Sequence, residues 1–396
     1  MRKIGYIIVL ALLAGCVDMG GKITELPVGL GAEEPSVITT DNGLVISWQE
    51  PYEGDILLKM SAHNGIKWSP AKTIAKGEEW FVNWADYPAI VANGDLLFAH
   101  YLQKTSNEML AYNVMFLVSS DMGESWSEPK QLHQDTVTAE HGFVSAVPYA
   151  DGFYVTWLDG RYTTGNKGKF TLRGVNVTNE GALVDAVEID DDVCTCCQTS
   201  MTIIDNVPWS FYRDRSEEEI RDIYFSKFVD NSWSEPELFN EDNWHIPGCP
   251  VNGPMATSYG NNLAVAWFSG ADGAYNVKLK ISTDAGNSFQ EEILVDGPKS
   301  IGRVDIKMDA SQIYVTFITN NGEQAAIKLN TYDYSGKLID AEILASVSAA
   351  RGTGFPRTAL WHENLIVTWT DVEEHTIKVL EYPLNKEHIS AQAGIR

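Results

Sequence analysis

Four arginines lie in segments that interrupt the apolar, strand-like runs of this chain. A planar guanidinium can bind a carboxylate through two parallel hydrogen bonds, so several such groups on one surface could hold an acidic ligand. The candidate ligand-binding arginines are Arg161, Arg213, Arg303 and Arg357. The alternative is that they pair with Asp159, Asp214 and Asp222 and only fasten loops together.

Other polar and aromatic residues occupy the same kind of segment. Asp159 lies two residues before Arg161, whereas Trp84 and Asn252 precede strand-like runs. Trp84 could stack on a sugar or simply pack against protein. His141 could be an acid/base catalyst, a ligand or a hydrogen-bonded loop residue. We therefore add Asp159, Trp84 and Asn252 to the ligand-binding candidates and His141 to the catalytic ones.

Four cysteines form a further group: Cys194, Cys196, Cys197 and Cys249. In an exported protein we expect two disulfides that join two neighbouring loops, each stabilising the fold by roughly 2–4 kcal/mol. The alternative is a soft-metal site for copper or zinc, built from thiolates of this group and His141 or His245. The spacing differs from the paired C-x-x-C pattern of zinc sites, so we favour disulfides and expect no cofactor.

A repeat of about fifty residues must position these candidates. A small residue followed by an aromatic residue or histidine recurs seven times, at intervals of 50 to 57 residues. Each pair ends a short apolar run of strand type, and such a period filled with strands is typical of a β-propeller. The sequence therefore predicts an all-β protein with seven four-stranded blades. The pairs are Ser47-Trp48, Ala99-His100, Thr156-Trp157, Ser210-Phe211, Ala266-Trp267, Thr316-Phe317 and Thr368-Trp369.

The fifth repeat shows the expected strands most clearly, over Met255–Tyr259, Leu263–Trp267, Tyr275–Ser282 and near Glu291–Val295. The last repeat has no clear fourth strand, and Ile23–Val28 precedes the first repeat. We expect that segment to complete the last blade and close the ring. In each blade, the loop before the first strand and the turn between the second and third strands share one face. The candidates should therefore gather at a central funnel.

A second motif follows the third strand of two repeats. Its pattern is Ser-x-Asp-x-Gly-x-x-aromatic, in which Asp accepts hydrogen bonds from the turn and Gly adopts a positive φ. The two copies are Ser119, Asp121, Gly123, Trp126 and Ser282, Asp284, Gly286, Phe289. They resemble the Asp-box, or BNR repeat, of the sialidase superfamily. The known enzymes have six blades, so six is the alternative to seven.

The resemblance implies that the ligand is an acidic glycan, because sialidases bind the carboxylate of their substrate with three arginines. It also implies that Asp86 could stand where the family has its acid/base aspartate. The Arg-Ile-Pro motif of the family is absent, and no Tyr–Glu nucleophile pair is evident. An exo-sialidase type of glycoside hydrolase and a non-catalytic propeller that binds a protein or a metal therefore both remain open, with a redox or copper site as a third hypothesis.

The N-terminus has the features of an export signal. Arg2 and Lys3 precede an apolar run, and Leu13-Ala14-Gly15-Cys16 resembles the lipobox of bacterial lipoproteins. The resemblance implies lipid on Cys16 and a place in the bacterial cell envelope, with Val17 favouring the outer membrane; an ordinary secretory signal is the alternative. We expect a signal peptide at 1–15, a lipidated tether at 16–22, a single propeller domain at 23–384 and a flexible tail at 385–396.

The formal net charge of the chain is −25, which disfavours nucleic acid and anionic lipid as partners. We therefore expect a small acidic glycan or a protein as the ligand, and contact with a membrane only through the lipid anchor.

Overall fold

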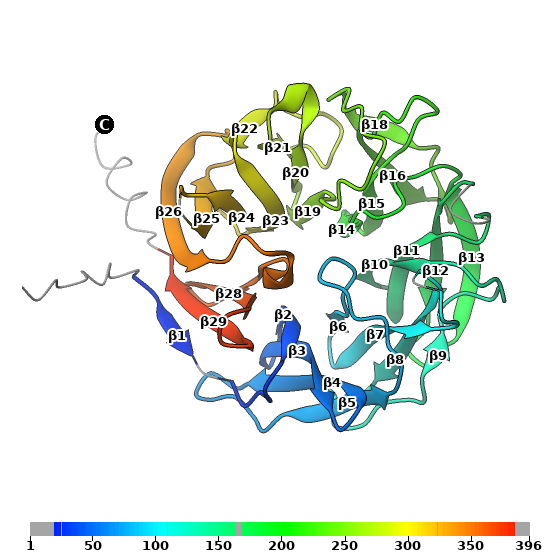
Figure 1. Ribbon diagram of the computed structural model, residues 1–396. Helices are drawn as coiled ribbons and strands as arrows, with labels where there is room; N and C mark the ends of the chain where they lie inside the picture. Colours follow the sequence, from blue (N-terminus) through cyan, green and yellow to red (C-terminus); the bar gives the residue numbers. More distant parts are fainter. Residues whose placement is uncertain (1–19, 25, 109, 164–167, 323, 385–396) are drawn as a thin grey trace, which may run out of the picture.

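The structure, a computed structural model, describes residues 20–384 apart from residues 25, 109, 164–167 and 323. Seven antiparallel sheets surround a central axis as the blades of a propeller (Figure 1). This confirms the predicted seven blades and excludes six. The expected signal peptide, Cys16 and the tail lie outside the described residues. No helix within the described ranges is long and apolar enough to cross a membrane.

The strands follow one another from the axis outward in each blade. Blades one to three comprise β2 (Glu33–Thr40), β3 (Gly43–Tyr52), β4 (Asp55–His63), β5 (Lys72–Gly77); β6 (Ile90–Asn93), β7 (Leu96–Lys104), β8 (Tyr112–Ser119), β9 (Lys130–Gln131); and β10 (His141–Tyr149), β11 (Gly152–Asp159), β12 (Thr171–Val177), β13 (Leu183–Asp190). Blades four and five comprise β14 (Ser200–Ile204), β15 (Val207–Arg213), β16 (Ile223–Val229), β17 (Ser232–Trp233), β18 (Glu237–Asn240); and β19 (Met255–Tyr259), β20 (Asn262–Ser269), β21 (Asn276–Ser282), β22 (Ile293–Asp296). Blades six and seven comprise β23 (Ser300–Met308), β24 (Ile313–Asn320), β25 (Ala325–Tyr332), β26 (Leu338–Val347); and β27 (Arg357–Trp361), β28 (Asn364–Asp371), β29 (Thr376–Pro383), β1 (Lys22–Thr24). Two short 3₁₀ turns are η1 (Ala271–Gly273) and η2 (Arg351–Thr353).

The recurring small–aromatic pair lies in the second strand of every blade. Adjacent residues of a strand point to opposite faces, so the large member packs against one neighbouring blade and the small member leaves room for the other. Trp157, for example, packs with Phe98 and Phe116 of blade two. His100 takes the aromatic position in blade two, and burial lowers its pKa to about 3, so it is neutral.

The two ends of the described chain meet in the last blade. β1 pairs in antiparallel fashion with β29, with Lys22 opposite Glu381 and Thr24 opposite Val379. The expectation that the segment before the first repeat supplies the missing outer strand is therefore confirmed, although this strand begins one residue earlier and is shorter than expected.

The two Asp-box turns have the expected local geometry. Asp121 Oδ1 accepts hydrogen bonds from Ser119 Oγ at 2.7 Å and from the backbone N–H of Ser125 at 2.9 Å. Gly123 has a φ of 80° and donates its N–H to Ser119 Oγ. Hydrogen bonds from Ser125 hold the pKa of Asp121 near 2. The second box, at Asp284, repeats this pattern, so both boxes are structural turns.

Removing β1 should destabilise the ring. A chain that begins at residue 26 loses the pairing with β29, at about 1 kcal/mol for each backbone hydrogen bond lost, and exposes an edge strand. We expect its unfolding temperature to fall by several degrees relative to a chain that begins at residue 20, measured by calorimetry. Equal unfolding temperatures would show that closure does not depend on β1.

Candidate functional site

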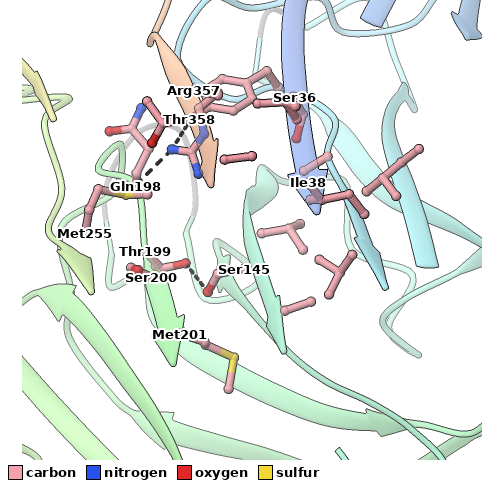
Figure 2. Close-up of a pocket in the computed structure, with 18 of the residues that line it drawn as sticks. Ser36, Ile38, Ser145, Gln198, Thr199, Ser200, Met201, Met255, Arg357 and Thr358 are labelled. Carbon is pink, nitrogen blue, oxygen red and sulfur yellow. Dashed lines mark hydrogen bonds between the residues drawn. The ribbon is translucent and has the colours of Figure 1, made fainter. Parts of the chain in front are cut away.

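A cavity of about 470 Å³ lies among the first strands of the blades, and residues of all seven blades line it. One part of its wall is apolar, with Ile38, Ile90 and Leu360 among the lining residues. Another part carries hydroxyl groups, including the hydrogen-bonded pair Ser145 and Thr199 (Figure 2). The cavity therefore offers both apolar and polar surface to one small ligand.

Arg357, at the start of β27, projects its guanidinium toward this cavity beside Met255 (Figure 2). Its contacts with the described chain are long. Nη1 lies 3.4 Å from the Tyr87 hydroxyl and 3.8 Å from Met255 Sδ, and Nη2 lies 3.9 Å from Asp305 Oδ1. A guanidinium has five N–H donors, so most of this hydrogen-bonding capacity is not used by the described residues. Such a group suits an anionic ligand.

A second cation, Lys307, also lines the cavity, and Asp305 lies between the two cations. Asp305 accepts hydrogen bonds from Thr358 N at 2.7 Å and Thr358 Oγ1 at 2.8 Å, and its Oδ1 lies 3.1 Å from Lys307 Nζ. Burial acts to raise the pKa of Asp305, but Arg357 and Lys307 hold it below its ordinary value. Burial lowers the pKa of Lys307, against the effect of Asp305. Two cations and one carboxylate leave surplus positive charge here.

Asp86 lines the same cavity and is almost completely buried. Its Oδ1 accepts the backbone N–H of Phe143 at 2.7 Å, and the Tyr112 hydroxyl lies 2.9 Å from its Oδ2 and 2.8 Å from Glu140 Oε1. One hydroxyl proton cannot serve two carboxylates, so one of the two acids must be protonated to complete the second hydrogen bond. Burial raises the pKa of Asp86 to about 7 and that of Glu140 to about 8.

His141, the other catalytic candidate, lies outside the residues that line the cavity. It is fully buried and stacks on His133, with ring centroids 3.8 Å apart. Its Nε2 lies 3.4 Å from Asp135 Oδ1 and 3.6 Å from Asp159 Oδ1. Arg161 binds Asp159 through two hydrogen bonds of 2.8 and 2.6 Å and reaches Asp135 at 3.0 Å. Arg161 and Asp159 therefore form the loop-fastening pair considered as the alternative.

This histidine cluster has the donor types of a metal site but not a suitable arrangement. His133, Asp135 and His141 place their ligand atoms within 4.8 Å of one another. The two rings are parallel to within 8°, so they cannot both direct an in-plane lone pair at one ion. Arg161 already compensates the nearby carboxylates, so the cluster is best described as a buried ion network.

Arg213 is buried between blades four and five rather than in the cavity. Its guanidinium lies 4.8 Å from the Trp244 ring, and burial lowers its pKa to about 10. The alternative had assumed that it pairs with the carboxylates of Asp214 and Asp222. It donates to backbone carbonyls instead. The acceptors are the carbonyls of Arg221, Asn252 and Phe268.

Arg303 and Trp84 occupy another separate contact. The Arg303 guanidinium lies 4.9 Å from the Trp84 ring and donates to the carbonyls of Ala350 and Gly354. Asn252 Oδ1 accepts the backbone N–H of Arg303 at 2.6 Å, so this side chain joins blades five and six. The structure thus does not bring the four arginines together, because each of the other three is bound by acceptors of the protein itself.

The cysteines form one disulfide rather than the expected two. Cys194 and Cys197 are bonded within the loop that leads into β14. Cys196 and Cys249 are free thiols, so no disulfide among the described cysteines joins blades four and five. With two sulfurs in the disulfide, only two thiols of the described residues remain as ligands for the copper or zinc considered above.

Several residues at or next to the cavity were missed in the sequence. Asp305 and Lys307 lie two residues apart in an otherwise largely apolar part of the first strand, and this period of two could have indicated charges on one face of β23. Tyr112 and Glu140 carry no such signal, because they meet only through the packing of blade two against blade three.

The comparisons with known proteins agree with this architecture. The protein family described as "BNR repeat-like domain" matches residues 52–296. No curated protein matches the chain. Among solved structures, the phage phi92 endosialidase is 10% identical, with a TM-score of 0.51 over 93% of this chain and 70% of that one. An α-L-arabinanase from Penicillium chrysogenum, complexed with arabinobiose, is 12% identical, with a TM-score of 0.48 over 92% of this chain and 97% of that one. A NanB sialidase from Streptococcus pneumoniae is 11% identical, with a TM-score of 0.43 over 89% of this chain and 67% of that one. At such identity, the likeness to the endosialidase shows the fold alone.

The raised pKa values of Asp86 and Glu140 predict how stability depends on pH. The folded chain holds these protons more tightly than the unfolded chain, so their contribution is complete below the ordinary pKa values of 3.8 and 4.5 and is lost as pH rises through about 7 and 8. We expect the unfolding temperature to fall between about pH 5 and about pH 9, and Glu140→Gln to weaken this fall.

The matched control for this measurement is Glu235→Gln, at an exposed glutamate. It should leave the pH profile of the unfolding temperature unchanged. A profile that is equally steep in wild type and Glu140→Gln would show that Glu140 is ionised in the folded protein.

Proposed function

Because the chain belongs to the family of BNR repeat-like domains, we propose that it recognises an acidic glycan in its axial cavity. In this proposal Arg357 binds the carboxylate of a sugar such as a sialic acid, and Lys307 adds positive charge beside it. The single observation that supports this most directly is the guanidinium of Arg357, whose donors remain largely unpaired by the described chain.

The rest of the cavity fits a sugar ring. Its volume of about 470 Å³ falls within the usual range of small-ligand sites. The apolar side chains of Ile38, Ile90 and Leu360 can contact the C–H face of a ring, whereas Ser145 and Thr199 can bind its hydroxyl groups.

Hydrolysis of the same ligand is a second candidate function, and one observation favours it. With a pKa of about 7, Asp86 keeps a partly protonated carboxyl at the cavity at neutral pH, as a general acid requires. Glycoside hydrolysis also needs a second group as nucleophile or base. Asp86 is the only acid among the described residues that line the cavity, so recognition remains the primary proposal.

Arg357→Ala should weaken binding of N-acetylneuraminic acid roughly tenfold or more, because charge-assisted hydrogen bonds to the carboxylate are lost. Binding is measured by calorimetric titration of the folded variant. The methyl ester of the sugar, which lacks the negative charge, should bind wild type about as weakly as the acid binds the variant.

The matched control is Arg173→Ala, which removes an arginine that pairs with Glu188 on the outer strands of blade three. It should leave the affinity unchanged. Equal binding of the acid to wild type and Arg357→Ala would contradict the proposed role of Arg357. A fluorogenic sialoside assay on wild type and Asp86→Asn distinguishes the two candidate functions, since only hydrolysis produces turnover that depends on Asp86.

We further propose that the propeller is held at a bacterial membrane, in the outer membrane of the cell envelope, by lipid on Cys16. The support is the charged start, the apolar run and the lipobox-like end of the signal segment.

Cys16→Ser should abolish incorporation of labelled palmitate in a bacterial host and release the protein from the membrane fraction. Cys249→Ser is the matched control and should retain the label. A wild-type protein that remains unlabelled and soluble after export would instead support an ordinary secretory signal.

A further inference from the structure

The axial cavity is closed at the end where the first strands of the blades begin. Trp84, in the loop before β6, stacks on Phe355, in the loop before β27, with ring centroids 5.7 Å apart and an angle of 15° between the rings. Figure 1 shows both loops reaching toward the centre of the ring. The Arg303 guanidinium lies 4.9 Å from the Trp84 ring. Side chains that precede or begin blades two, six and seven therefore meet at this end of the axis.

A hydrogen-bonded glutamine completes this closure. Gln198 donates from Nε2 to the Ala85 carbonyl at 2.7 Å, and its Oε1 accepts the backbone N–H of Gly253 at 3.2 Å. Ala85, Gln198 and Phe355 are only 5%, 7% and 6% exposed. Ala85 and Gln198 also line the cavity, so they belong to its end wall. We call Trp84, Ala85, Gln198 and Phe355 the cap.

The opposite end of the cavity is open to solvent. Along β2, which runs away from the cap, Ser36 is buried, Ile38 is partly exposed and Thr39 is exposed, and all three line the cavity. Ala92 on β6 and Leu360 on β27 also line this end and are partly exposed. A small ligand can therefore reach the cavity from this side without displacing the cap.

Positive charge is distributed along the path from the open end inward. β23 also runs away from the cap, so Lys307 lies closer to the opening than Asp305 does. Arg357 begins β27 and therefore lies deeper, beside Tyr87. The Tyr87 ring in turn lies 6.0 Å from the ring of Phe355 in the cap. An anion that enters at the open end meets Lys307 first and Arg357 afterwards.

We propose that ligands enter the axial cavity at the end opposite the cap, through an opening bordered by Thr39, Ala92 and Leu360, while the cap stays closed. The entrance is thus on the face of the propeller opposite the loops at which the sequence predicted a central funnel.

The closed end also restricts which glycan fits, and this part of the inference rests on the proposed function. A cavity of about 470 Å³ has the size of a site for one small molecule. The cap leaves no path for a chain to continue beyond Arg357. The acidic sugar that reaches Arg357 must therefore be the end of its glycan chain.

A thiol introduced on the cavity wall by Ser145→Cys tests the entrance without any glycan. The probe is sulfonatoethyl methanethiosulfonate, a small anionic reagent for thiols, and mass spectrometry of proteolytic peptides measures the labelling rate at this position. The introduced thiol should be labelled. Adding Ala92→Trp should slow its labelling at least about tenfold, because the indole fills the opening. The matched control Asn261→Trp adds the same side chain in an exposed turn on the same face and should leave the rate unchanged, since Asn261 is not among the described residues that line the cavity.

Two results would overturn the proposed entrance. If the introduced thiol is not labelled in the absence of Ala92→Trp, the cavity is closed at both ends. If it is labelled equally fast with and without Ala92→Trp, ligands pass the cap instead. The unfolding temperature of each variant shows whether the fold is retained. If Ala92→Trp does not fold, Thr39→Trp blocks the same opening from an exposed position.

The restriction to a chain end is tested by calorimetric titration. Sialyllactose, in which the acidic sugar ends the chain, should bind the wild type, and Ala92→Trp should weaken this binding at least about tenfold. An oligosaccharide with carboxylates only on internal sugars should not compete, and competition would contradict the restriction. If the wild type binds neither sialyllactose nor N-acetylneuraminic acid while the introduced thiol is labelled only through the open end, the proposed function fails and the entrance stands.

Discussion

The pairing of β1 with β29 closes the ring, and the axial cavity depends on that closure. Blades one and seven meet through hydrogen bonds from Glu34 N to Thr370 Oγ1 at 3.1 Å and from Thr39 Oγ1 to the Leu360 carbonyl at 2.5 Å. Arg357 begins the first strand of blade seven, and the adjacent blade one contributes Ile38 to the apolar part of the cavity wall. If the ring opened, the guanidinium would face solvent instead of a bounded site.

The same closure explains why so many polar side chains lie near the axis. In several blades, a side chain at or just before the first strand accepts a backbone N–H of the next blade. Asp86 does so for Phe143, Asn252 for Arg303 and Asp305 for Thr358. These bonds satisfy backbone groups that would otherwise be buried without partners. Some residues that the sequence suggested as parts of one binding site therefore connect neighbouring blades by hydrogen bonds.

The sequence could predict the fold because each blade encodes its own strands and its own small–aromatic pair. It could not predict which arginine faces a ligand, because that depends on the acceptors that neighbouring blades supply. Arg161 is an exception, since Asp159 lies two residues away and marks it as a local pair. The sequence near Arg213 and Arg303 does not indicate their partners, because backbone carbonyls from other blades bind them. The disulfide was likewise hidden among the cysteines, whose order does not fix which sulfurs meet.

The charge of the cavity depends on the protonation of Asp86. An ionised Asp86 would face the same space as Arg357, cancel part of its positive potential and repel an incoming carboxylate. Burial opposes this ionisation and raises the pKa of Asp86 to about 7, so the carboxyl is mostly protonated below neutral pH. The buried acids of blades two and three therefore act together with the cations of blades six and seven. The buried acids limit the negative charge at the cavity, and the cations supply positive charge. Both groups surround one cavity because the ring is closed.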